Sequence, residues 1–200
     1  MIEKKSRRDL VITTTKSIIS SISQKLETSA SKAKLAELRN SLGRPLDQSL
    51  SAIQIVFERM PEEFAGYGDK LSWEEQAIVT TVQLYAVLQQ ANGQSVDFNG
   101  RDNAWNNIGD SFSALRTIDA SASTDHRFNA MITSQSFEEL VIHLRHLIKL
   151  LKSKSKESKI NFSMLAGDLY SFLSGYEDSV RLNWSRAYYS QRQTNEDKGE

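Results

Sequence analysis

The scarcity of helix-breaking residues constrains the fold of this 200-residue chain more than any other feature of its sequence. The only prolines are Pro45 and Pro61, and the long stretches between such breakers contain few glycines. Proline lacks a backbone donor and clashes with the preceding helical turn, so helices persist most easily where it is absent. The sequence therefore predicts an all-α protein.

The clearest helical pattern lies between residues 137 and 151. Ser136 and Glu139 precede it with the spacing of a capping box, in which two side chains satisfy free backbone N–H groups at the start of a helix. Ser72 and Glu75 repeat that spacing and predict a second long helix that ends at about Ala91. The apolar residues of the first pattern recur at spacings of three and four, as on one helical face: Phe137, Leu140, Val141, Leu144, Leu147, Ile148 and Leu151.

Weaker patterns predict the other helices and the loops between them. Gly43 with Pro45 ends one helix, and Asp47 is expected to cap the next. A run of Val-Ile-Thr-Thr-Thr favours strand locally within the first helix. The predicted bundle has about seven to nine helices. The helices are expected at residues 10–26, 31–42, 102–118, 161–173 and 177–189, after Asp47 and from Asp125, with loops at 61–71 and 92–100.

A polar linker from Asp119 to Thr124 is the best candidate for a boundary inside the chain. It divides an N-terminal helical half, residues 1–118, from a C-terminal helical half, residues 125–190. The polar residues 191–200 are predicted to be a tail. The two halves are expected to pack into one compact unit.

The charge of the chain is balanced overall but unevenly distributed. Residues 1–45 hold ten basic and four acidic side chains, and residues 143–159 hold six basic and one acidic. Residues 58–75 have the opposite bias, with six acids and two bases. A chain of this kind can be neutral in sum and still present a basic face.

Sequence signatures of enzymes are missing from this chain. It has no cysteine, which excludes disulfides and thiolate metal sites, and it has no phosphate-binding glycine loop or serine nucleophile elbow. His143, His146 and Glu139 share a helical face and make a metal-dependent hydrolase imaginable, but their spacing matches no recurring ligand pattern. We therefore expect no catalytic residue, no bound metal and no cofactor.

The lysines and arginines are more informative. Arg145, Lys149 and Lys152 are spaced by four and three, so they form one stripe beside the apolar stripe of the same helix. Such a stripe can neutralise successive backbone phosphates, although a solvated helix face has the same pattern. No apolar segment approaches the length that crosses a bilayer, and we expect a cytoplasmic protein with no membrane partner.

Four segments resemble one known family, in the same order along the chain. They are the Leu-Arg helix with its glycine end at residues 33–46, the central helix at 82–90, the Asn-Ile-Gly segment with Ala-Leu-Arg at 107–116, and the C-terminal motifs from 126 to 189. The last of these ends in Asn-Trp-Ser-Arg-Ala-Tyr-Tyr. Together they resemble the CasB family, the small subunit of the type I-E CRISPR surveillance complex Cascade, over about residues 20–190. The family often has paired arginines where this chain has Arg39-Asn40, His126-Arg127 and Arg145-His146.

The resemblance implies a non-enzymatic helical subunit of a complex for antiviral defence. Its implied partners are other Cascade subunits, crRNA, target DNA and a second copy of itself. It also implies a basic surface that stabilises the R-loop and the displaced strand. The alternative is a helical protein–protein adaptor. We predict that the surface consists of Arg39, Arg44, Arg127, Arg145, Lys149 and Lys152, with Lys32, Lys34, Arg116 and Arg181 as secondary candidates.

Overall fold

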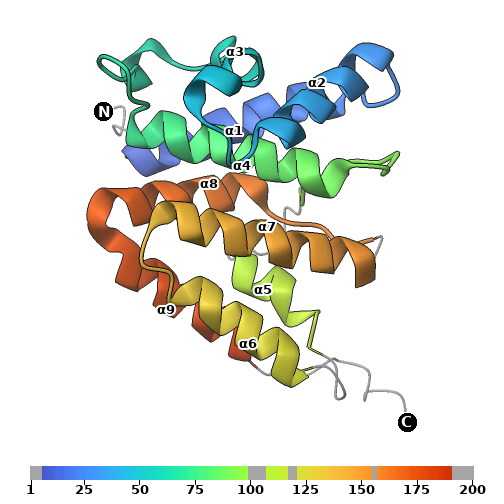
Figure 1. Ribbon diagram of the computed structural model, residues 1–200, viewed down its shortest axis with the longest axis vertical. Helices are drawn as coiled ribbons and strands as arrows, with labels where there is room; N and C mark the ends of the chain where they lie inside the picture. The colour runs from blue at the N-terminus through green and yellow to red at the C-terminus, as the bar shows by residue number, and fades with distance from the viewer. Residues whose placement is uncertain (1–5, 99–106, 117–120, 155–156, 191–200) are drawn as a thin grey trace, which may run out of the picture.

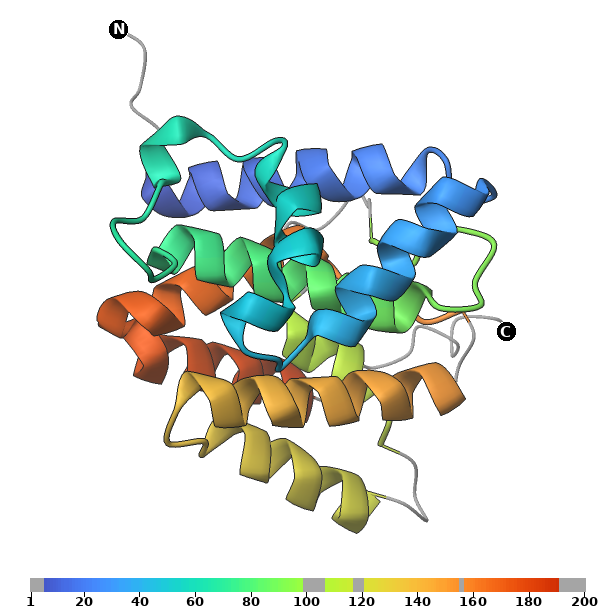
Figure 2. The same ribbon diagram turned by 45° about the horizontal axis from the view of Figure 1, so that its top comes forward.

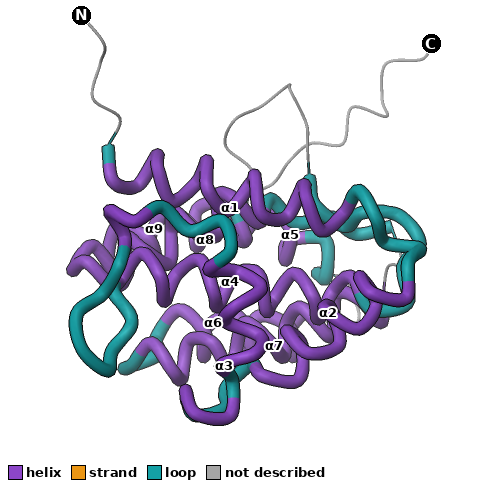
Figure 3. The backbone as a smooth tube through the Cα atoms, turned by 90° about the horizontal axis from the view of Figure 1, so that it is seen from above, coloured by secondary structure: helices purple, strands orange, loops and turns teal. Residues whose placement is uncertain are grey.

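The computed structural model describes residues 6–98, 107–116, 121–154 and 157–190. Most of this backbone is helical (Figure 1, Figure 3), so the predicted all-α fold is confirmed. Two 3-10 turns, η1 (Leu46–Gln48) and η2 (Glu62–Phe64), and a π turn, η3 (Phe172–Tyr176), lie among the helices. The nine α-helices of these ranges are α1 (Arg7–Ser23), α2 (Ser29–Ser41), α3 (Leu50–Phe57), α4 (Trp73–Gln89), α5 (Ile108–Ser113), α6 (Ser121–Ile132), α7 (Phe137–Lys154), α8 (Phe162–Ser171) and α9 (Glu177–Tyr189).

Helix α4 forms the centre of the fold. Residues on all of its sides are buried, and it packs against α1, α2, α3, α7 and α8. Figure 2 shows α4 between α1 and α7. Its predicted capping box is confirmed, because Ser72 Oγ accepts a hydrogen bond from Glu75 N at 3.1 Å and Glu75 Oε2 accepts one from Ser72 N at 2.8 Å.

Helix α7 has the apolar face that its sequence predicts, and all seven residues of the stripe are buried. Its N-terminus forms only half of the predicted capping box. Ser136 Oγ accepts a hydrogen bond from Glu139 N at 3.1 Å, but the Glu139 carboxylate accepts one from Gln135 N at 2.7 Å rather than from Ser136 N.

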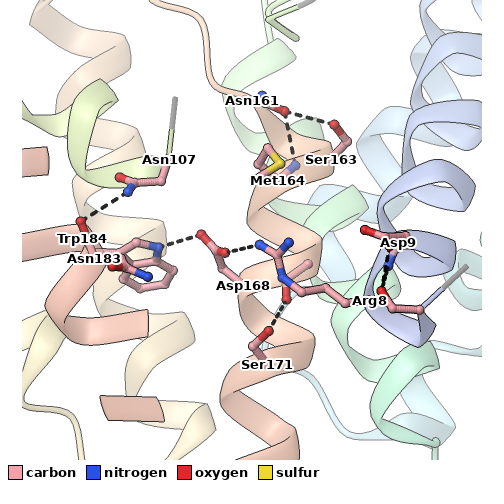
Figure 4. Close-up of polar contacts among 12 residues, drawn as sticks. Arg8, Asp9, Asn107, Asn161, Ser163, Met164, Asp168, Ser171, Asn183 and Trp184 are labelled. Carbon is pink, nitrogen blue, oxygen red and sulfur yellow. Dashed lines mark hydrogen bonds and ion pairs between the residues drawn. The ribbon is translucent and has the colours of Figure 1, made fainter. Parts of the chain in front are cut away.

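A buried carboxylate joins α1, α8 and α9. Asp168 Oδ1 accepts a hydrogen bond from Arg8 Nη2 at 2.8 Å, and Asp168 Oδ2 accepts one from Trp184 Nε1 at the same distance (Figure 4). The indole of Trp184 is 1% exposed. Helix α5 then packs on α9, where a Cβ at Gly109 would stand 2.1 Å from the Trp184 carbonyl oxygen, so only glycine fits.

Three local predictions in the N-terminal half meet different outcomes. Helix α1 runs through the Val-Ile-Thr-Thr-Thr segment, because its buried residues pack against α4 and α8 and this packing outweighs the local strand preference. Gly43 has the left-handed φ of 78° that the end of α2 requires. The prediction that Asp47 caps α3 is wrong, since Asp47 lies in η1 and Ser49 is the N-cap.

Two predicted boundaries near the middle of the chain are also wrong. Helix α5 begins at Ile108, not at residue 102, because the extended backbone of Asn107 starts it and the Asn107 side chain accepts a hydrogen bond from Gly109 N at 2.8 Å. It ends at Ser113, short of residue 118. The predicted linker 119–124 is helical from Ser121, where α6 begins. Residues 99–106 and 117–120 lie outside the described residues.

The predicted loop at 92–100 has buried residues in the part before residue 99. Val96 and Asp97 are buried, and Asp97 forms an isolated parallel bridge with Ile160. The Asp97 carboxylate accepts a hydrogen bond from Phe162 N at 3.2 Å, at the start of α8. Burial raises the pKa of Asp97 from 3.8 to about 6, against the opposing effects of the backbone donors of Phe162 and Phe98 and the charges of Lys16 and Lys159.

Asp168→Ala should lower the free energy of unfolding by about 2–4 kcal/mol, because it leaves the buried Trp184 N–H without an acceptor and Arg8 without its partner. Trp184→Phe should cost less, since it removes the donor but keeps the ion pair. Urea denaturation measures both. A loss below about 1 kcal/mol for Asp168→Ala would contradict a structural role for this network.

Asp97 should make the protein more stable in mild acid. Its folded pKa of about 6 exceeds the unfolded value of 3.8, so the folded state binds the proton more tightly and stability falls as pH rises through this window. Asp97→Asn should remove this dependence, which is worth at most about 3 kcal/mol. The unfolding free energies of both proteins at the two ends of the window test it. If the unfolding free energies of the two proteins changed with pH in the same way, the raised pKa of Asp97 would be contradicted.

Candidate nucleic-acid interface

The basic stripe of α7 faces the C-terminal ends of α2 and α4. Arg145 Nη1 donates a hydrogen bond at 3.4 Å to the carbonyl of Leu42, the C-cap of α2. Lys152 Nζ donates at 3.3 Å to the carbonyl of Val87 in α4 and to the side chain of Gln90. A cation near the last carbonyls of a helix is favourable, so these contacts place the stripe where two helices end.

Cations from α2 and α6 join this stripe. Lys152 has a lowered pKa, first because of its partial burial and then because of the charge of Arg39. The charge of Arg127 on α6 helps to lower the pKa of His146 on α7, so these two side chains lie near each other. Arg44 follows α2 two residues after Leu42. We call this set the α7 basic face: Arg39, Arg44, Arg127, Arg145, Lys149 and Lys152.

Pairing with acids separates the two groups of predicted cations. Within the described part of the chain, no member of the α7 basic face has an acidic oxygen within 4.0 Å. Every secondary candidate does have one. Their pairs are Lys32–Glu27 at 3.7 Å, Lys34–Glu58 at 3.8 Å, Arg116–Asp125 at 3.0 Å and Arg181–Asp178 at 3.3 Å.

Two of the secondary candidates are parts of the packing. The guanidinium of Arg116 lies 5.4 Å and 5.2 Å from the ring centroids of Tyr188 and Tyr189, and Tyr188 donates a hydrogen bond at 2.7 Å to the same Asp125 that Arg116 binds. Arg181 donates at 2.7 Å to the carbonyl of Ser134. These contacts hold α9 against α5 and against the end of α6, which leaves both arginines poorly placed to reach a ligand.

The members of the α7 basic face differ in accessibility. Arg44, Arg127 and Lys149 are exposed, while Arg39, Arg145 and Lys152 are partly buried. The Nε of Arg145 is buried and has no hydrogen-bond partner among the described residues. The three exposed cations can therefore meet an anion directly, and the partly buried ones strengthen the positive potential beneath them.

The histidines of α7 show no metal-binding arrangement. Nε2 of His143 lies 3.7 Å from Oε1 of Glu139, and His146 is exposed. Groups of three or more histidine, cysteine or acidic side chains that could hold a metal are not found in the described ranges. Helices long and apolar enough to span a bilayer are not found there either.

The tryptophans and tyrosines are only partly core residues. Trp184 is buried, whereas Trp73 is 53% exposed at the start of α4. Tyr188 is buried and stacks on Phe128 with ring centroids 3.7 Å apart. Trp105 lies outside the described residues. Neither buried ring, Trp184 or Tyr188, offers a free face for a nucleobase.

Sequence reasoning missed His146 as a member of this surface. It lies on α7 between Arg145 and Lys149, and its exposed ring is within electrostatic reach of Arg127. The spacing of three residues on one helix is enough to place His146 near Lys149. The position of Arg127 depends on how α6 packs beside α7, which no local pattern shows.

The fold and the α7 basic face define an all-α protein in which six cations at and around α7 have no acidic partner within 4.0 Å among the described residues. The chain belongs to the family described as CRISPR-associated protein Cse2 (CRISPR_cse2), whose model matches residues 34–189. The resemblance to the CasB family that the sequence indicates is thereby confirmed.

Solved structures share this fold. CasB from Thermobifida fusca is 20% identical, with a TM-score of 0.70, and the match covers 90% of this chain and 98% of that one. A Cse2-family protein from Thermus thermophilus is 24% identical, with a TM-score of 0.62 and coverage of 88% and 97%. A chain of a CRISPR RNA-guided surveillance complex is 20% identical, with a TM-score of 0.65 and coverage of 89% and 92%. A comparison with curated proteins finds no match.

Arg116 and Arg127 should differ in their effects on stability. Arg116→Ala removes an ion pair and two cation–π contacts and should cost about 1 kcal/mol of unfolding free energy. Arg127→Ala should change it by less than about 0.5 kcal/mol, because the exposed side chain has no acidic partner within reach among the described residues. Thermal or urea unfolding of the two variants measures the contrast. Equal losses would contradict the division into packing cations and free cations.

Proposed function

We propose that this chain is the non-catalytic small subunit of a type I-E CRISPR RNA-guided surveillance complex, and that its α7 basic face binds the nucleic-acid backbone. Family membership and the fold shared with a chain of a surveillance complex support the first part. The observation that carries the second part is the absence of acidic partners around the six cations of the face, among the described residues.

Unpaired cations fit a phosphate backbone for a simple electrostatic reason. A lysine or arginine that already pairs with a carboxylate gains little from a phosphate, whereas a free cation gains an anion and releases the condensed counterion of the nucleic acid. The face offers charges from α6, from α7 and from α2 and the residues that follow it. Such a surface positions a strand without reading it.

This division of labour suits a guided complex. Pairing between crRNA and target DNA reads the sequence, so a subunit that holds the R-loop and the displaced strand needs only backbone contacts. In this proposal the face stabilises the strands, a second copy of the chain and other Cascade subunits flank it, and cleavage belongs to another protein.

One feature favours the alternative of a protein–protein adaptor. A groove of about 600 Å³ lies between α3, α4 and α7, next to Arg44, and is lined in part by Leu42, Ile53 and Val141. Exposed Ile142 lies at its edge. A partner that fills this groove would be held mainly by apolar contacts, so its affinity would depend weakly on salt, whereas backbone binding depends on it strongly.

The three exposed cations of the face supply the sharpest test. Arg44→Glu, Arg127→Glu and Lys149→Glu together should weaken binding of single- and double-stranded DNA by at least about tenfold at low salt and flatten the slope of affinity against salt. Arg145 and Lys152 stay unchanged, because their bonds to carbonyls of α2 and α4 would confound the result. Fluorescence anisotropy over a salt series measures both quantities.

The matched control reverses three exposed cations elsewhere, Lys16, Lys25 and Arg59, which also lack an acidic partner within 4.0 Å in the described ranges. It changes the net charge equally and should bind DNA much better than the first variant. Equal losses in the two variants would show a general charge effect and contradict a located interface.

A further inference from the structure

His146 lies beside the lysines and arginines of the α7 basic face. Unlike them, a histidine can lose its charge near neutral pH. Its ring is exposed on α7, directly after Arg145 and three residues before Lys149. Residues three apart on a helix share a side, so His143 precedes it on the same surface. A ligand that contacts Arg127 and Lys149 therefore passes beside this imidazole.

The charges that act on His146 come from two helices. Desolvation lowers the pKa of the imidazole most, and electrostatic interactions with His143, Lys149 and Arg145 on α7 and with Arg127 on α6 lower it further. The acid nearest along α7, Glu139, is engaged by His143 and by Gln135 N.

Besides α6, helices α4 and α2 lie beside this part of α7, and neither brings an acidic side chain that acts on His146. Residues 76–89 of α4 carry no charged side chain. From α2, Arg39 acts on Lys152. In the free protein, desolvation and then repulsion from the surrounding cations lower the pKa of His146 and so disfavour its protonated form.

We infer that His146 contacts the phosphodiester backbone and takes up a proton when nucleic acid binds, so that binding at the α7 basic face strengthens in mild acid. This inference rests on the proposed function. A bound phosphate supplies the negative charge that the site lacks, which offsets the repulsion from Arg127, Arg145 and Lys149. A ligand that favours the protonated form must, by linkage, bind more tightly when protons are abundant.

The test compares DNA affinity at constant ionic strength, in a buffer without phosphate, for the full chain, His146→Gln and His146→Arg. Between about pH 8 and about pH 6 the unchanged chain should gain about three- to tenfold in affinity, since each unit of pKa rise is worth up to tenfold. His146→Gln should bind DNA with the same affinity at both pH values, and therefore lose this gain. His146→Arg should bind tightly at both pH values.

NMR of the imidazoles tests the same inference without comparing variants by affinity. The chain has three histidines, His126, His143 and His146, so single glutamine variants assign their signals. The pKa of His146 should rise when DNA is added. Inorganic phosphate at the same phosphate concentration should leave it unchanged, and an equal rise there would overturn the assignment to a nucleic-acid backbone.

The possible results separate failure of this inference from failure of the proposed function. Salt-sensitive DNA binding with the same affinity at both pH values, or a pH gain that persists in His146→Gln, would overturn the role of His146 and leave backbone binding intact. If the gain in DNA affinity at the lower pH disappears in His143→Gln but persists in His146→Gln, the proton is taken up by His143 and not by His146. Absence of DNA binding at any salt or pH would overturn both proposals.

Discussion

The carboxylate of Asp168 sets the positions of elements on both sides of the molecule. It binds Arg8 of α1 and Trp184 of α9 from a helix that also packs against the central α4. Because a buried carboxylate is costly without donors, these two partners are required as well as favourable. The placement of α9 then determines how closely α5 can approach, at Gly109, and where Tyr188 meets Asp125 of α6. Helix α6 carries Arg127, so the geometry of the basic face depends on the partly buried contacts of Asp168 with Arg8 and Trp184.

The basic face itself results from a contrast between free and satisfied charges. Arg116 and Arg181 have carboxylates, aromatic rings and carbonyls around them, and their charges help to pack α9. Lys152 is held partly buried beside the ends of α2 and α4, where its pKa is lowered by burial and by Arg39. Cations held together without acids repel one another, a cost that an anionic ligand relieves on binding. This relief links the arrangement of the face to the proposed binding of a phosphate backbone.

The features that can be predicted from the sequence are those that depend on residues close together in the chain. The α7 stripe and the Ser72–Glu75 capping box depend on spacings of three and four, and both were predicted. The burial of Asp97 was not, because its bridge partner Ile160 is distant in the chain. Charge runs also do not show which cations pair with acids, since the partner of Lys34 is Glu58, which follows another helix. Sequence patterns locate cations, whereas only the fold shows which of them keep their charge available.

The lifetime of the R-loop in a reconstituted surveillance complex is the direct test of nucleic-acid binding by the α7 basic face. The complex should be assembled with the unchanged chain, with the Arg44, Arg127 and Lys149 reversal, or with the Lys16, Lys25 and Arg59 control, and its dissociation from target DNA followed in time. We expect normal assembly in all three cases and a clearly shorter R-loop lifetime only with the first variant. An unchanged lifetime in a fully assembled complex would contradict the proposal that the α7 basic face holds the nucleic acid.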